Sequence, residues 1–280
     1  MATSDESPKT LRVAPRGELP ALGRPGGGRA SAPLLAYVLH RYDWSETSLI
    51  VELYTRAQGR LVVIAKGAKR PTSQLRPVLL PFQPLHAQLG KTPADERAEI
   101  HLLRSAEWVG GRPLLAPAAM FSGFYLNELL LKLLVRQDAY PLLFDAYADT
   151  LAALATEADE AAALRAFELM LLRELGWLPE LNVATQTAEP VQPEQRYTLH
   201  AEAGIAPGPA GLRGASWVAL EAALAHGSTA ALRAACAGEA GALRVPLRNL
   251  LHYHLGSTPL RTRAVWQGVQ RLASRSEPNR

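Results

Sequence analysis

The sequence contains one cysteine, Cys236, and this scarcity excludes two kinds of stabilisation. A single thiol cannot form an internal disulfide, and it cannot supply the several thiolates of a structural zinc site. We interpret Cys236 as a small buried residue of an alanine-rich helix. A chain without disulfides suits the reducing cytoplasm.

Long apolar runs are also missing. No segment reaches the roughly 18 to 20 apolar residues that a membrane-spanning helix needs, and the first 33 residues lack the apolar core of a secretory signal. Yet 48% of the 280 residues are hydrophobic, which is enough to fill a core. We therefore expect a soluble, cytoplasmic globular protein that has no membrane association.

Recognisable catalytic motifs are absent as well. The run Gly90-Lys91-Thr92 resembles the end of a phosphate-binding loop, but Leu85 stands where that loop requires glycine. His252 and His254 are two residues apart in a helical segment, so they point to different faces and cannot share a metal ion. The sequence contains no zinc-protease, nucleophile-elbow or dinucleotide-binding motif. We expect no enzymatic activity and no cofactor.

Acidic residues are missing from two long stretches, one between Glu52 and Asp95 and the other between Glu239 and Glu277. Residues 34–113 carry eleven basic and seven acidic side chains, residues 183–280 carry ten and six, and residues 114–182 carry four and ten. Clustered positive charge repels itself unless a polyanion neutralises it, which favours a nucleic-acid partner. The alternative is that each stretch forms an ordinary solvated basic face.

Residues 34–113 have the pattern of a small barrel. Five short segments are rich in β-forming residues and are separated by glycine and proline: Leu35–Tyr42, Ser48–Tyr54, Arg60–Ala65, Leu85–Leu89 and Ile100–Trp108. In the last of them, residues 100, 102, 104, 106 and 108 form the more apolar side of a period-2 pattern. The spacing predicts a five-stranded OB-type barrel, which commonly binds oligonucleotides, or an SH3-like one.

The remaining chain is mainly helical, so the predicted fold class is α+β. Residues 1–33 are polar and rich in proline and glycine, which predicts a flexible tail. Helical periodicity favours a bundle in residues 114–182, with Thr156 and Asp159 resembling a capping box. We expect a β excursion over residues 182–206. The helices are predicted at residues 118–136, 141–155, 159–175, 217–226, 229–237, 243–255 and 261–273.

The sequence resembles the RecO family of bacterial recombination mediators over residues 34–275. The N-terminal likeness lies in YVLHRYDWSETSL at 37–49, GRLVVIAKGAKR at 59–70 and LPFQP at 80–84. Later likenesses are GFYLNELL at 123–130, the helix from FEL at 167–169 to ELG at 174–176, and LGSTPLRTR at 255–263. Many members carry four zinc-binding cysteines in the β excursion. This chain has none there, so we expect no zinc.

The resemblance implies a role in DNA repair through the RecFOR recombination pathway. Such proteins bind single- and double-stranded DNA, anneal complementary strands, engage the C-terminal tail of the single-stranded-DNA-binding protein SSB, and act with RecR to load RecA. A location in the cytoplasm at the bacterial nucleoid follows. An OB-barrel factor for RNA or translation is the alternative function, and a metal-dependent nuclease is a third.

Two sets of candidate residues combine this resemblance with the charge pattern. The DNA-binding candidates are basic residues from both acid-free stretches and the strand that precedes the first of them: Arg41, Arg60, Lys66, Lys69, Arg70, Arg76, Arg244, Arg248, Arg261 and Arg263. An acidic, aromatic SSB tail needs an apolar groove with a cationic rim. The candidates for that groove, which surface solubilisation could also explain, are Lys132, Arg136, Phe124, Tyr125, Leu129, Arg165 and Arg173.

Three aromatic residues are candidates for stacking on bases. Tyr42, Trp44 and Tyr54 lie in or beside the predicted barrel strands, near the basic run. Aromatic rings on an OB-fold can stack on bases while cations follow the phosphates. The same three side chains could instead fill the barrel core.

Overall fold

A computed structural model describes residues 32–90, 100–111, 113–156, 159–256, 258–262 and 265. Most of the predicted tail, together with Lys91, Arg263 and most of the expected helix at 261–273, lies outside this range. Within it, no helix is long and apolar enough to cross a membrane.

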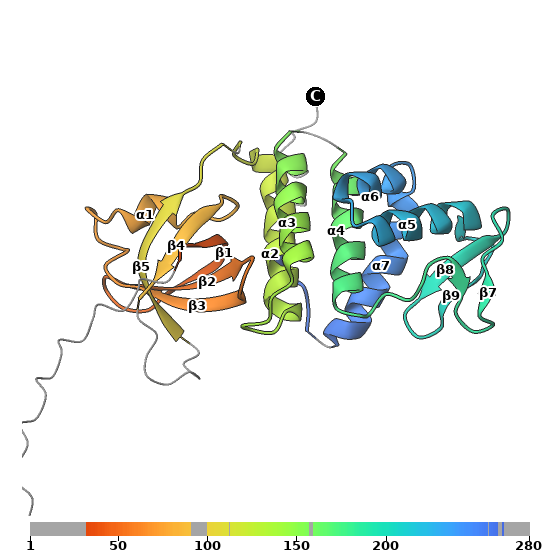
Figure 1. Cartoon of the computed structure of the whole chain (residues 1–280), viewed down its shortest axis with the longest axis horizontal. Coiled ribbons are helices and arrows are strands. Elements are labelled where there is room, and N and C mark those ends of the chain that lie inside the picture. Colours follow the sequence, from red (N-terminus) through yellow and green to blue (C-terminus); the bar gives the residue numbers. More distant parts are fainter. Residues whose placement is uncertain are drawn as a thin grey trace, which may run out of the picture. The chain divides into compact units, whose positions relative to one another are not determined.

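Five strands form a closed barrel (Figure 1). They are β1 (Leu34–Asp43), β2 (Leu49–Thr55), β3 (Gly59–Ala65), β4 (Leu85–Leu89) and β5 (Ile100–Trp108), with the short helix α1 (Leu75–Val78) between β3 and β4. Their order is β1-β2-β3-β5-β4, and β4 closes on β1. The parallel pairing of β3 with β5 gives the OB-type arrangement rather than the SH3-like alternative. The prediction of a five-stranded OB-type barrel is confirmed.

The barrel core is small and aliphatic because the strands alternate inward and outward side chains. Residues such as Val38, Val51, Leu53 and Val63 fill it. The alternation predicted for β5 is only partly correct. The pairing with β4 shifts register at Gln88 and Leu89, so Leu103 and Ala106 are buried while residues 100, 102 and 108 are exposed.

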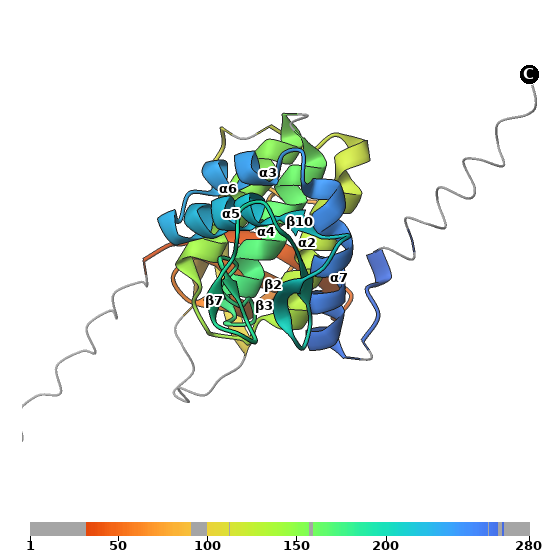
Figure 2. The same ribbon diagram turned by 90° about the vertical axis from the view of Figure 1, so that its right-hand side faces the viewer.

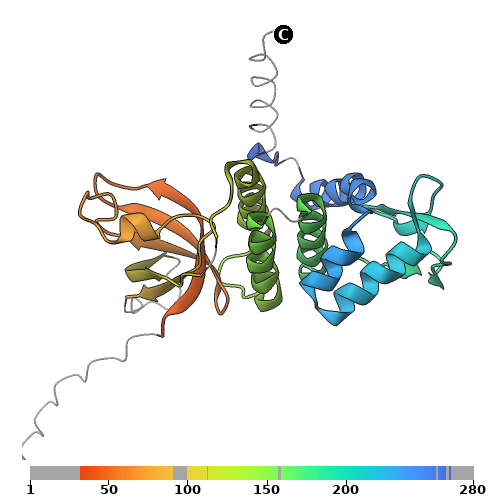
Figure 3. The same cartoon turned by 90° about the horizontal axis from the view of Figure 1, so that it is seen from above.

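The rest of the chain is mainly helical, as predicted (Figures 1 and 3). A 3-10 turn, η1 (Pro117–Ala119), leads into the first long helix. The helices are α2 (Met120–Leu133), α3 (Pro141–Ala155), α4 (Glu160–Glu174), α5 (Gly214–His226), α6 (Thr229–Cys236) and α7 (Ala240–Leu255). Pro141 occupies the first turn of α3, as its fixed φ favours. Figure 2 shows α5, α6 and α7 grouped around α4.

The predicted capping box is wrong in one detail. Asp159 is the N-cap of α4, and its carboxylate accepts a hydrogen bond from the Ala162 N–H at 3.0 Å. The Thr156 hydroxyl instead donates back to carbonyls at the end of α3.

The β excursion consists of short strands: β6 (Val183–Ala184), β7 (Glu189–Pro190), β8 (Arg196–His200), β9 (Gly204–Pro207) and β10 (Leu212–Arg213).

Candidate nucleic-acid interface

The connection between β3 and β4 presents three exposed cations. Lys66 and Arg70 lie in the turns that follow β3, and Arg76 lies on α1. None of the three forms an ion pair or side-chain hydrogen bond with any other described residue. We call Lys66, Arg70 and Arg76 the barrel rim. Unpaired, solvated cations at the end of a barrel can bind phosphates without first breaking a bond within the protein.

Arg41 is also exposed, at the end of β1. It pairs across the ladder with Val51, whose side chain belongs to the barrel core. Paired residues share a face of the sheet, so Arg41 is on the same face as Val51, the face that lines the barrel. Tyr42, the next residue along the strand, is on the opposite, outer face.

The three aromatic candidates have different environments. The Trp44 side chain, in the turn between β1 and β2, is 62% exposed, and Tyr42 is 46% exposed. Tyr54 is fully buried, and its ring lies 5.3 Å from that of Phe144 on α3. Tyr54 therefore packs between barrel and helices, outside the barrel core, and cannot stack on a base.

Lys69 is bound to the turn that carries Trp44. Its ammonium lies 3.1 Å from an oxygen of Asp43 and donates to the Ser45 carbonyl at 3.1 Å. Its backbone N–H donates to the Thr47 carbonyl at 2.9 Å. This predicted DNA-binding residue therefore has partners within the chain, unlike the barrel rim.

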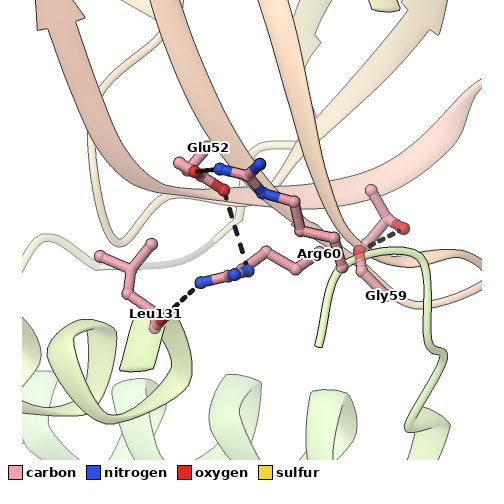
Figure 4. Close-up of polar contacts among 6 residues, drawn as sticks. Glu52, Gly59, Arg60 and Leu131 are labelled. Atoms are coloured by element: carbon pink, nitrogen blue, oxygen red, sulfur yellow. Dashed lines mark hydrogen bonds and ion pairs between the residues drawn. The ribbon is translucent and has the colours of Figure 1, made fainter. Parts of the chain in front are cut away.

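Arg60 faces the helices rather than solvent (Figure 4). Its guanidinium donates to the Leu131 carbonyl near the end of α2 and lies 3.8 Å from the buried carboxylate of Glu52. Arg136 donates to the other oxygen of Glu52 at 2.9 Å. Burial lowers the pKa of Arg60, and its side chain is only 13% exposed. The contacts of the Arg60 guanidinium therefore lie within the fold, between the barrel and the helices.

The β2–β3 turn docks closely on the loop between α2 and α3. Gly59 has a φ of +66°, and a β-carbon there would lie 1.8 Å from the Asp138 carbonyl oxygen, so only glycine fits. Arg56 donates two hydrogen bonds of 2.9 Å to Asp145 on α3, and the pair raises the pKa of Arg56. We call these contacts of Arg56, Gly59 and Arg60 with the helical part the joint. The sequence did not predict the joint, because its partners are 71 to 89 residues apart.

Helix α7 carries the second basic surface. Arg244, Arg248 and His252 are four residues apart, so they form one stripe along the helix. Arg244 is exposed, Arg248 is half-buried, and neither has an ion-pair partner among the described residues. Arg261 lies beyond this helix, where its backbone N–H donates to Glu128 at 2.7 Å. Arg263 is outside the described residues.

The seven residues predicted to bind an SSB tail have different environments. Leu129 is fully buried, whereas Phe124 is 40% exposed and its ring lies 4.9 Å from that of Phe82. Tyr125 and Arg165 both bind the buried Glu168, at 2.7 Å each. The remaining cations are also engaged: Lys132 with Glu128 at 3.1 Å, Arg173 with Glu221 at 2.6 Å and Arg136 with Glu52.

The β excursion contains no recognisable metal centre. Across the described part of the chain, no group of three or more histidine, cysteine or acidic side chains could hold a metal ion. Tyr197 and Ile205 are buried there, and Trp217 of α5 donates to the Tyr197 carbonyl at 3.0 Å. Cys236 lies apart from this module in α6, where burial raises the pKa of its thiol to about 12.

Comparison with known proteins decides the family. A model described as "Recombination protein O N terminal" matches residues 34–112, the barrel. A second, described as "Recombination protein O C terminal", matches residues 115–264. The chain belongs to the RecO family.

Curated relatives extend this match over most of the chain. The sequence is 51% identical over 251 residues to "DNA repair protein RecO" of Variovorax paradoxus (strain S110). It is 49% identical over 247 residues to the protein of the same name from Polaromonas naphthalenivorans (strain CJ2). Each match covers 85% of this chain and 96% of the relative. The predicted membership of the RecO family is confirmed.

Proposed function

We propose that this protein acts in DNA repair as a non-enzymatic recombination mediator that binds single- and double-stranded DNA. The barrel rim and the α7 stripe bind phosphates, and Trp44 and Tyr42 contact bases. The observation that carries this proposal is the barrel rim itself: three exposed cations, unpaired within the described residues, in the same connection as Lys69, which contacts the turn of the exposed Trp44. Phosphate contact with aromatic stacking is how OB-folds hold single strands.

The two basic surfaces also support strand annealing. Two complementary strands repel each other, and a protein that neutralises phosphates on both lowers that repulsion. The rim lies on the barrel and the stripe lies on α7, so separate cations are available for two strands. The family resemblance adds engagement of the SSB tail and cooperation with RecR to load RecA. We include these as parts of the proposal.

The test is DNA binding as a function of salt by the triple variant Lys66→Glu, Arg70→Glu and Arg76→Glu. We expect affinity for a single-stranded oligonucleotide to fall about a hundredfold or more at low salt, and the salt slope to flatten by about two units, since each phosphate contact contributes about 0.7. Annealing of complementary strands, bare and coated with SSB, should slow in parallel.

The matched control is Arg56→Glu, a charge reversal on the same barrel at a residue bound to Asp145. Its salt slope should equal that of the wild-type protein. If the triple variant binds DNA with unchanged affinity and slope, the rim is an ordinary solvated face and the proposal fails. Preference for structured RNA over single-stranded DNA would favour the RNA-binding alternative.

A further inference from the structure

The ammonium of Lys69 contacts the residues on both sides of Trp44. One contact is the Asp43 carboxylate and the other is the Ser45 carbonyl, each at 3.1 Å. The Lys69 backbone N–H reaches Thr47 in the same turn, at 2.9 Å. Lys69, in the connection that follows β3, therefore contacts the last residue of β1 and two residues of the turn between β1 and β2.

Among the described residues, the other hydrogen bonds within this turn are longer. The backbone N–H groups of Trp44 and Ser45 reach the Ser48 carbonyl at 3.3 and 3.4 Å, which are long hydrogen bonds. The Ser45 hydroxyl accepts from the Ser48 N–H at 3.2 Å. Trp44 is 62% exposed, so packing cannot hold its indole in one place. The shorter contacts in the turn come from Lys69.

We propose that Lys69 is a positioning residue, which holds the 43–48 turn so that Trp44 is presented to a nucleic-acid base, and that it is not a phosphate contact. This inference rests on the proposed function and gives Lys69, predicted from the sequence to bind DNA, a different role. A lysine whose ammonium already has a carboxylate and a carbonyl gains less from a phosphate than Lys66 or Arg70 does. An ordered indole loses less conformational entropy when a base stacks on it.

The pair can be removed without changing the net charge, and this separates positioning from phosphate binding. The variant is Asp43→Asn with Lys69→Met, and the matched control is Lys66→Gln on the barrel rim. Two probes are used, a thymidine oligonucleotide and an oligonucleotide of equal length whose sites are all abasic. The abasic probe keeps the phosphates and lacks the bases.

We expect the wild-type protein to bind the thymidine probe about tenfold more tightly than the abasic one, as stacking on one base would give. The Asp43→Asn/Lys69→Met variant should lose this preference and keep the wild-type salt slope. Lys66→Gln should keep the preference and flatten the slope by about 0.7. Lys69→Arg should retain the preference, and in a Trp44→Ala background removal of the pair should cost nothing more.

Four results would overturn the inference. If the pair variant flattens the slope and weakens both probes equally, Lys69 contacts phosphate. A pair variant that keeps its base preference shows that the turn does not need Lys69. If the wild-type protein binds both probes equally while Lys66→Gln still flattens the slope, DNA binding by the rim stands and only the inference fails. Binding of neither probe refutes both.

Discussion

The basic residues of the barrel fall into two groups, one bound to partners within the fold and the other exposed without such partners among the described residues. Arg56 and Arg60, in and after the β2–β3 turn, bind Asp145, Leu131 and Glu52 and join the barrel to the helices. The rim residues Lys66, Arg70 and Arg76 find no such partner among the described residues. All five belong to one acid-free stretch of sequence. The comparison shows that one run of positive charge can contain both cations that are bound within the fold and exposed cations that have no partner among the described residues.

The largest stability effect should come from breaking the joint. Arg60→Met leaves the Glu52 carboxylate, 5% exposed, with Arg136 as its remaining cation. Loss of one partner of a buried pair costs about 3 kcal/mol of unfolding free energy, because a buried charge becomes poorly compensated. Urea unfolding measures this cost.

A double variant, Glu52→Gln with Arg60→Met, serves as the control for this change. It should recover much of the loss, because no uncompensated carboxylate remains. The DNA salt slope should stay at its wild-type value in both variants. A flatter slope in folded Arg60→Met protein would show that Arg60 contacts phosphate after all and that the two sets of cations are not distinct.

The second prediction extends the comparison to the helices, where Lys132 is bound like Arg60 yet remains 20% exposed. Its ammonium contacts Glu128 and the Pro259 carbonyl, so an acidic SSB tail would compete with both. Lys132→Glu should weaken tail binding about tenfold by replacing attraction with repulsion. Fluorescence titration with the SSB tail peptide measures this, and binding of bare DNA should change little.

Lys132→Met is the matched control, because it removes the cation without adding an anion. Its tail affinity should lie between those of the wild-type protein and Lys132→Glu. Unchanged tail binding in both variants would place the tail site elsewhere. Equal loss in the annealing of bare and SSB-coated strands would instead mean that Lys132 supports the fold or touches DNA.

How much the sequence could predict depends on the range of the interactions. The strands and helices were predictable because period-2 and period-3.6 patterns, and a proline such as Pro141 in the first turn of a helix, are local signals. The partners of Arg60 and Lys132 were not, since Leu131 and Pro259 lie 71 and 127 residues away from them. Charge counting therefore located the basic barrel and could not separate Arg60 from Lys66. Burial of Tyr54 in the barrel core was one of the two alternatives, but its packing against Phe144 of α3 could not be predicted, for the same reason.

The third prediction concerns Glu128, which anchors residues 261 and 262. Burial alone would raise its pKa, but hydrogen bonds from Thr262 and Arg261, together with Lys132, outweigh burial and hold the pKa below its ordinary value of 4.5. A lowered folded-state pKa gives stability that is present above pH 4.5 and is lost as the pH falls through the lowered value. Glu128→Gln should therefore cost about 1 kcal/mol at pH 7 and progressively less in acid.

Urea unfolding of both proteins at pH 7 and at about pH 3 checks this sign. The wild-type protein should lose its advantage over Glu128→Gln on acidification. An equal difference at the two pH values would show that the charge of Glu128 contributes nothing and that only its shape matters. The result also tells whether Lys132, like Arg60, is bound to an ionised carboxylate within the fold.

The smallest expected effect is that of a metal chelator, which should not change the thermal midpoint. We expect side-chain packing to hold the β excursion together. Tyr197, Ile205 and Trp217 are buried, and the Tyr197 hydroxyl accepts a 3.0 Å hydrogen bond from the Gln192 N–H. Trp217→Phe, which removes the indole N–H, should lower the midpoint equally with and without chelator. One stoichiometric zinc per chain by elemental analysis, together with a chelator-dependent midpoint, would contradict this account, because Cys236 alone cannot bind a structural zinc ion.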